Sequence, residues 1–221
     1  MMNSGLPDPV ALIALIGAMA IVPFLAVTVT SYVKLVVVFG LIRNALGVQN
    51  IPPNIALNAV AILLSVYIMQ PAAKNAYEAV RQKAIVFENF HELSETLPLA
   101  TEPFRKFILK NTSQQERHFF TATTRELWSE ADADSVTEND FMILIPAFIT
   151  SELADAFKIG FLLFLPFIII DLLISNILLA MGMMMVSPMA ISLPFKLFLF
   201  VAVNGWQRLI HGLVLSYAGP T

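Results

Sequence analysis

Residues 159–195 read IGFLLFLPFIIIDLLISNILLAMGMMMVSPMAISLPF, a largely apolar stretch that indicates the fold class. It contains a single charged residue, Asp171. One helical crossing of a lipid bilayer needs about 20 mostly apolar residues, so the stretch is long enough to reach across. Three further stretches have the same character, with Arg208 as their only charge, and cover residues 9–33, 44–73 and 197–221. The sequence therefore predicts an all-α membrane protein with four hydrophobic segments.

The composition excludes several classes of protein. The chain has 221 residues, of which 57% are hydrophobic and 13% charged, about half the charged share of a typical soluble domain. Its mean hydropathy is +0.76, which excludes an ordinary cytosolic enzyme and a disordered chain. The absence of cysteine from the sequence excludes thiol catalysis, disulfide scaffolds, zinc ribbons and iron–sulfur clusters. The net charge of −3 gives no basic footprint for nucleic acid.

The charges are concentrated in the middle of the chain. Between Lys74 and Asp140 lie 20 of the 29 charged side chains. We therefore predict three domains: N-terminal hydrophobic helices over residues 1–73, a polar helical middle region over 74–140, and a C-terminal hydrophobic helical hairpin with a Met-rich bend over 141–221.

Two features near the N-terminus bear on topology. Ala18-Met19-Ala20 could be a signal-peptide cleavage site, but Met1–Val10 contains no Lys or Arg, so we expect a retained helix. Lys34 and Arg43 favour a cytoplasmic position for the connection between the first two hydrophobic segments.

Prolines and polar residues predict where helices begin and end. Asn54 follows two prolines and is expected to cap a helix, which Pro71 would end. Two prolines in Ser94–Pro103 indicate a loop.

Two further motifs predict helix starts in the polar middle region. Ser113-x-x-Glu116 is a capping-box pattern that opens a helix towards Trp128. Thr137-x-x-Asp140 similarly precedes the next apolar run.

The run Met181-Gly182-Met183-Met184-Met185-Val186-Ser187-Pro188 is the first functional candidate. Four methionines within five residues cannot share one helical face, so part of the run is expected to be a bend or loop before Pro188. Methionine is unbranched and adaptable, so the run could fill gaps in a hairpin or form a deformable seal around a passage. Thioethers also select Cu(I), and a soft-metal site is the third possibility.

Charged residues of the apolar C-terminal part form the second candidate: Glu152, Asp155, Lys158, Asp171, Lys196 and Arg208. A charge at a helix centre in lipid costs about 2.5–3.5 kcal/mol, so such groups are expected to pair. Asp155 and Lys158 can pair on one helix face, whereas Asp171 needs a cation from another segment or chain. We hypothesise that all but Arg208 pair between subunits, with a proton or ion relay as the alternative.

The sequence carries no catalytic motif that we can identify. His91-Glu92 is not followed by a second histidine at the zinc-protease spacing, and no G-x-S-x-G or phosphate-binding loop occurs. We therefore expect no enzymatic activity, cofactor or metal.

Several collinear motifs resemble the R subunit of the type III secretion export apparatus, the SctR family, which is homologous to the flagellar P subunit FliP. The first half is matched by Arg43–Gly47, Ile51–Asn54 and Leu57-Asn58. The second half is matched more specifically, by Ala156–Phe161, Leu165–Asp171, Met181–Pro188, Pro194–Leu197 and Gly205-Trp206. The resemblance extends from Leu12 to Leu215.

This resemblance implies a homo-oligomer, a pentamer in the family, in a helical, cone-like export gate. The expected partners are the S and T subunits, the U subunit, and needle-base and inner-rod components. The gate would lie in the bacterial inner membrane, extend to the periplasmic side and pass unfolded secreted proteins, with no nucleic acid involved.

The same resemblance implies roles for the methionine run. Met181, Met183, Met184 and Met185 would line the narrowest zone as a gasket, with Gly182 and Pro188 shaping the turn. The missing signal sequence favours the virulence-type injectisome branch. A flagellar gate subunit, a copper or small-solute transporter and a plain membrane scaffold are the alternatives.

Overall fold

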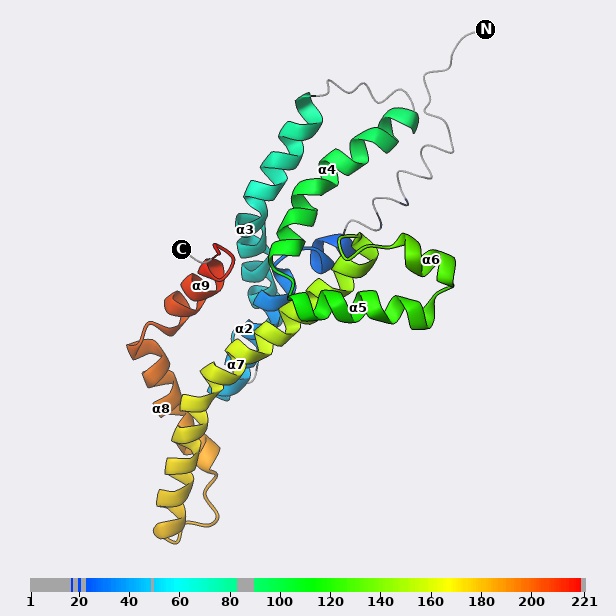
Figure 1. Cartoon of the computed structure of the whole chain (residues 1–221). Coiled ribbons are helices and arrows are strands. Elements are labelled where there is room, and N and C mark those ends of the chain that lie inside the picture. Colours follow the sequence, from blue (N-terminus) through cyan, green and yellow to red (C-terminus); the bar gives the residue numbers. More distant parts are fainter. Residues whose placement is uncertain (1–16, 18–19, 21–22, 49, 83–89, 220–221) are drawn as a thin grey trace.

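The computed structural model describes residues 17, 20, 23–48, 50–82 and 90–219. Within these ranges every regular element is a helix and no strand occurs, which confirms the all-α prediction (Figure 1). The helices are α2 (Tyr32–Leu46), α3 (Asn54–Gln82), α4 (Phe90–Lys110), α5 (Gln114–Leu127), α6 (Glu130–Ser135), α7 (Phe141–Ala180), α8 (Pro188–Ala202) and α9 (Gly205–Leu215). The possible cleavage site and most of the first hydrophobic segment lie outside the described residues.

Helix α7 is the longest helix in the described part of the chain. Its 40 residues give a length of about 60 Å at 1.5 Å per residue, twice the roughly 30 Å hydrocarbon core of a bilayer. One end meets α4 and α5, and the other end projects away from the rest of the chain beside α8 (Figure 1). α7 therefore connects the polar middle region to an extended apolar hairpin.

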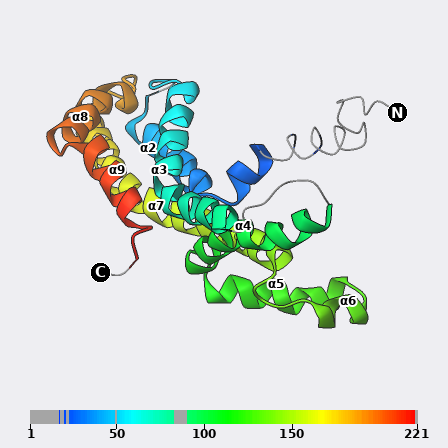
Figure 2. The ribbon, with the colours of Figure 1, turned by 90° about the horizontal axis from the view of Figure 1, so that it is seen from above.

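Helix α2 forms the centre of the core. It packs against α7, α3 and α8, and Leu35, Val38 and Phe39 are completely buried. Gly160 of α7 allows this close packing, because a Cβ there would lie 2.2 Å from a methyl carbon of Leu41. The view from above shows α2 lying alongside α7 (Figure 2), and α3 packs against α2 and α4.

The prolines do not end helices where the sequence predicted. Helix α3 continues through Pro71, because buried residues on both sides of it, Met69 and Ala76, are held by packing. The predicted loop over Ser94–Pro103 is also wrong, since α4 runs through it. Tertiary packing overrides the cost of the missing N–H groups.

The predicted helix starts are partly confirmed. Ser113 caps α5 by accepting a hydrogen bond from the Glu116 N–H at 3.2 Å, and α5 ends before Trp128. Asp140 directly precedes α7, as expected. A helix begins at Asn54, as expected, but Asn54 does not cap it, because its side-chain oxygen accepts a hydrogen bond from Arg43 instead.

Two of the four predicted hydrophobic segments are not single straight helices. Among the described residues, two helices are long and apolar enough to cross a membrane, residues 54–81 and 141–180, and α8 with α9 would make a third. That pair is bent by 58° at Asn204, which adopts a left-handed conformation with φ +53°. The predicted segment 197–221 is therefore not one straight helix, and segment 159–195 contains a hairpin turn.

Candidate functional site at the methionine-rich hairpin

The turn between α7 and α8 is a defined structure built by Gly182 and Pro188. Gly182 has φ +73°, and its N–H donates to the Leu179 carbonyl at 3.0 Å while the Met183 N–H donates to the Leu178 carbonyl at 2.9 Å. This pair of hydrogen bonds is the Schellman motif that ends many helices at a left-handed glycine. Pro188 then begins α8 at a position where no N–H is needed. The predicted bend is confirmed.

All four predicted gasket methionines lie at the tip of this hairpin. The exposed fractions are 66% for Met181, 41% for Met183, 82% for Met184 and 101% for Met185. The described part of the chain leaves the last two side chains almost entirely uncovered. The tip is therefore an adaptable apolar surface that lipid or another protein chain would have to cover.

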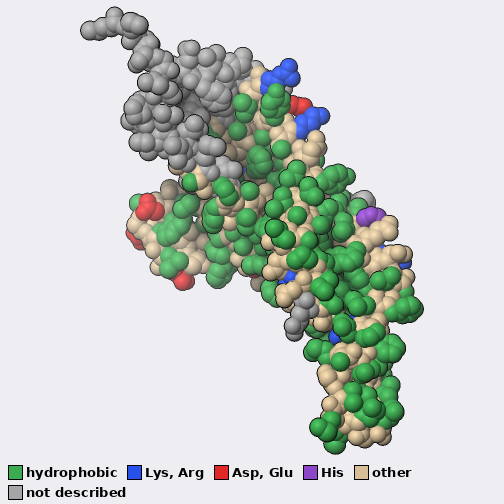
Figure 3. All heavy atoms as spheres, turned by 180° about the vertical axis from the view of Figure 1, so that it is seen from behind, with side chains coloured by type: hydrophobic (Ala, Val, Ile, Leu, Met, Phe, Trp, Pro, Cys, Tyr) green, Lys and Arg blue, Asp and Glu red, His purple; other side chains and the backbone are tan. Residues whose placement is uncertain are grey.

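The arms of the hairpin are apolar on several faces. On α7, exposed side chains include Phe161, Leu172 and Ile177, and on α8 they include Phe198 and Val201. Seen from behind, hydrophobic side chains cover most of the narrow arm (Figure 3). So large an exposed apolar surface indicates lipid or protein partners.

Asp171 and Lys196 join the two arms of the hairpin near its base. The Lys196 ammonium lies 2.5 Å from Asp171 Oδ2 and donates to the Ala45 carbonyl at 3.3 Å. Ser192 donates to Asp171 Oδ1 at 2.6 Å. The pair thus connects α7, α8 and the C-terminal end of α2, where the helix dipole favours a cation. The Asp171 partner comes from another segment, which was one of the two expected outcomes.

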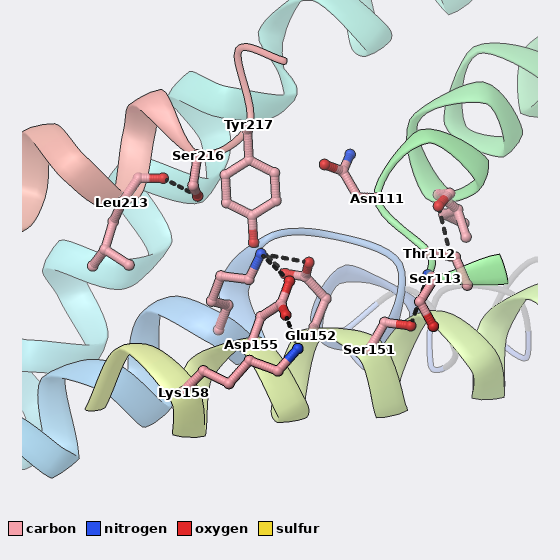
Figure 4. A network of polar contacts seen from close by, with 12 residues as sticks. Asn111, Thr112, Ser113, Ser151, Glu152, Asp155, Lys158, Leu213, Ser216 and Tyr217 are labelled. Carbon is pink, nitrogen blue, oxygen red and sulfur yellow. Dashed lines mark hydrogen bonds and ion pairs between the residues drawn. The ribbon is translucent and has the colours of Figure 1, made fainter. Parts of the chain in front are cut away.

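Glu152 is the centre of a second, buried network (Figure 4). The Lys34 ammonium lies 2.8 Å from Glu152 Oε1, with side-chain exposed fractions of 5% and 0%. The Tyr217 hydroxyl donates to Glu152 Oε2, and its ring centroid lies 4.4 Å from the Lys34 ammonium. Burial, together with the Glu152 carboxylate, raises the pKa of Tyr217 far above its usual value, so the hydroxyl stays a neutral donor. This network ties α2, α7 and the segment after α9 together.

Asp155 and Lys158 form the expected pair on α7, with Lys158 exposed and Asp155 half-buried. Their charged atoms are 3.2 Å apart, and Asp155 also lies 3.7 Å from Lys34. All five side chains expected to pair between subunits thus have a partner inside one chain, and Glu152 and Lys196 are buried within it. Pairing between subunits stays a prediction.

Sequence similarity covers almost the whole of this arrangement. The FliP family matches residues 15–213, which include both charge networks except Tyr217, and the hairpin. The chain belongs to the FliP family. This membership agrees with the resemblance drawn from the separate motifs.

Individual FliP-family relatives are similar at full length. "Yop proteins translocation protein R" of Yersinia pestis is 49% identical over 214 residues, which cover 97% of this chain and 99% of the relative. "Virulence protein YscR" of Salmonella typhimurium is 46% identical, with 96% and 99% covered. "Hypersensitivity response secretion protein HrcR" of Ralstonia nicotianae is 46% identical, with 94% and 96% covered.

Three members of the two networks were missed in this FliP-family sequence. Lys34 was interpreted only as a topological signal, although a lone cation in a long apolar stretch needs a counter-charge. Tyr217 and Ser192 gave no signal at all, because a single hydroxyl in an apolar stretch is common. Their roles depend on contacts between residues far apart in the sequence.

Proposed function

We propose that this chain is a core subunit of the type III secretion export gate of an injectisome. Its FliP-family membership and its full-length similarity to proteins named for translocation, virulence and secretion support this function. The long apolar helices support a location in a membrane. We place the subunit in the bacterial inner membrane, in an assembly that extends to the periplasmic side.

The assembly we propose is a homo-oligomer, a pentamer as the family resemblance implies, joined by the S, T and U subunits and by needle-base and inner-rod components. Hairpin tips from neighbouring copies would meet around a common axis. The exposed apolar surface of α7 and α8 is compatible with this role, because neighbouring copies or lipid would cover it.

The methionine tips would act as a gasket. A ring of apolar side chains opposes water and ions by dewetting. Methionine side chains can rotate aside for an unfolded polypeptide and close again, because each has three rotatable bonds and no branch. The single observation that carries this proposal is the exposure of Met184 and Met185 at 82% and 101% on a rigidly built turn.

The two ion-pair networks would hold the hairpin arms while the tip deforms. Lys196 and Asp171 fix α8 to α7 and α2, and Lys34 and Glu152 fix α2 to α7. The exposed Lys158 and the half-buried Asp155 would be available for additional pairing with a neighbouring subunit. The gate is a passive conduit in this account, and its energy would come from partner proteins.

Replacing Met183, Met184 and Met185 together by Ala tests the seal. We expect the assembled gate to leak ions or small molecules, because truncation opens the apolar constriction. The matched triple Leu variant keeps volume and apolarity but loses adaptability, so we expect it to stay sealed and secrete more slowly. Met142→Ala, at an exposed methionine near the other end of α7, is the control.

Unchanged leakage in the triple Ala variant, with normal assembly shown by co-purification, would contradict the gasket. Stoichiometric Cu(I) in the purified protein, lost in the same variant, would instead favour a copper transporter. Normal secretion by the triple Ala variant, together with loss of secretion on deletion of the gene, would favour a plain scaffold.

A further inference from the structure

A deep apolar groove runs between α7 and the bent α8–α9 arm. Its volume is about 640 Å³, within the range of about 300–1,000 Å³ typical of small-molecule sites. Phe167 and Leu213, both almost fully buried, form part of its floor. Gly205, Arg208 and Gly212 line it from α9 at helical spacing, so one face of α9 borders the groove along its length.

Arg208 is the single charged side chain that lines the groove. It is exposed and has no ion-pair partner among the residues that the structure describes. An arginine in an otherwise apolar membrane region needs an anion or water. The groove thus combines one cationic side chain with an otherwise largely apolar lining.

The apolar helices of a second copy are a poor source of that anion. Helices α2, α8 and α9 contain no Asp or Glu. The three carboxylates of α7, on Glu152, Asp155 and Asp171, each lie within 4.0 Å of a lysine ammonium in their own chain. Binding one of them to Arg208 would require one of these ion pairs to share or lose its carboxylate.

We propose that this groove binds an anionic phospholipid. The headgroup phosphate would bind the Arg208 guanidinium, whose planar donors match phosphate geometry. One acyl chain would lie along α9 in the apolar groove. The space is available at Gly212, because a Cβ there would meet no atom within 4 Å. The lipid would fill the groove between α7 and the bent α8–α9 arm.

Native mass spectrometry of the detergent-purified full-length oligomer tests this site. The protein is titrated with palmitoyl-oleoyl phosphatidylglycerol and, separately, with the zwitterionic phosphatidylcholine of the same chains. We expect phosphatidylglycerol to bind with at least about tenfold higher affinity, and an excess of inorganic phosphate not to displace it. Equal binding of the two lipids, or displacement by phosphate alone, would overturn the proposal.

Two variants locate the lipid. Arg208→Gln removes the cation and Gly212→Leu fills part of the groove, and each should lower phosphatidylglycerol affinity about tenfold, as expected for loss of one charge-assisted contact or its apolar counterpart. The matched controls are Arg125→Gln on α5 and Gly40→Leu on α2, where added carbon also meets no atom within 4 Å. Wild-type affinity in both groove variants would overturn the proposal.

Further measurements cover the case in which a groove variant misfolds. Arg208→Lys keeps the charge and should retain most of the phosphatidylglycerol affinity, whereas loss of affinity equal to that of Arg208→Gln would contradict the role of charge. A photo-crosslinking amino acid at Val203, inside the groove, should label lipid in the assembled complex. Labelling of a protein subunit there instead would show that the groove is a protein interface.

Discussion

Removing the Lys34 ammonium should strongly destabilise the chain, because it leaves Glu152 as an unpaired buried charge. Glu152 is completely buried, and Lys34 is the one cation within 4.0 Å of it in the described structure. Breaking such a pair from one side costs about 3–5 kcal/mol. Glu152→Gln should cost less, about 1–3 kcal/mol, because Lys34 keeps Asp155 at 3.7 Å and the Tyr217 ring.

The control is Lys158→Met, because the Lys158 side chain has an exposed fraction of 74% and pairs at the surface. This substitution should lower the free energy of unfolding by only about 0–1 kcal/mol. The assay is thermal unfolding of the detergent-purified protein, followed by helical circular dichroism. For a chain of this size each kcal/mol shifts the midpoint by about 2–4 °C, so Lys34→Met should lower it by about 6–20 °C.

The double variant Lys34→Met with Glu152→Gln completes a thermodynamic cycle. It removes both charges together, so the two effects should be non-additive by about 2–3 kcal/mol or more. Additive losses, or a Lys34→Met midpoint equal to that of Lys158→Met, would refute the reasoning that an uncompensated buried carboxylate dominates the cost.

Three further predictions concern the hairpin and its packing. Asp171→Asn should weaken the detergent-purified oligomer, because it leaves a buried ammonium without its counter-charge; size-exclusion chromatography that shows an intact oligomer would contradict this. Gly160→Ala should destabilise the chain by about 1–3 kcal/mol, because the new Cβ would lie 2.2 Å from Leu41; the same thermal assay should leave Gly40→Ala almost unchanged. Gly182→Ala should cost about 1–2 kcal/mol because of its positive φ, and an unchanged midpoint would argue against the Schellman turn.

The sequence predicted the parts of the fold that depend on composition and local chemistry. Helical class, the concentration of polar helices in the middle and the Met-rich bend all follow from hydropathy, glycine and proline positions. The Ser113 cap was predictable because its partner is three residues away. The Asp155–Lys158 pair was predictable because helical spacing alone brings the two together.

The errors arose where distant contacts outweigh local preference. Pro71, Pro98 and Pro103 lie inside helices, although each removes a backbone donor, because the helices around them are held by packing. The partner of Asp171 was not identified as Lys196, since 25 residues separate them and the connecting turn had to be known first. The Lys34–Tyr217 contact spans most of the chain and had no local signature.

If methionine tips of neighbouring subunits meet on a common axis, a disulfide cross-link should join them there. The sequence has no cysteine, so Met184→Cys introduces a single thiol into each copy. Mild oxidation of the assembled gate should give a disulfide-linked dimer of this chain, whereas Ala122→Cys on α5 should not. Failure of Met184→Cys to cross-link, in an assembled gate where the thiol reacts with a lipid-soluble reagent, would contradict the account.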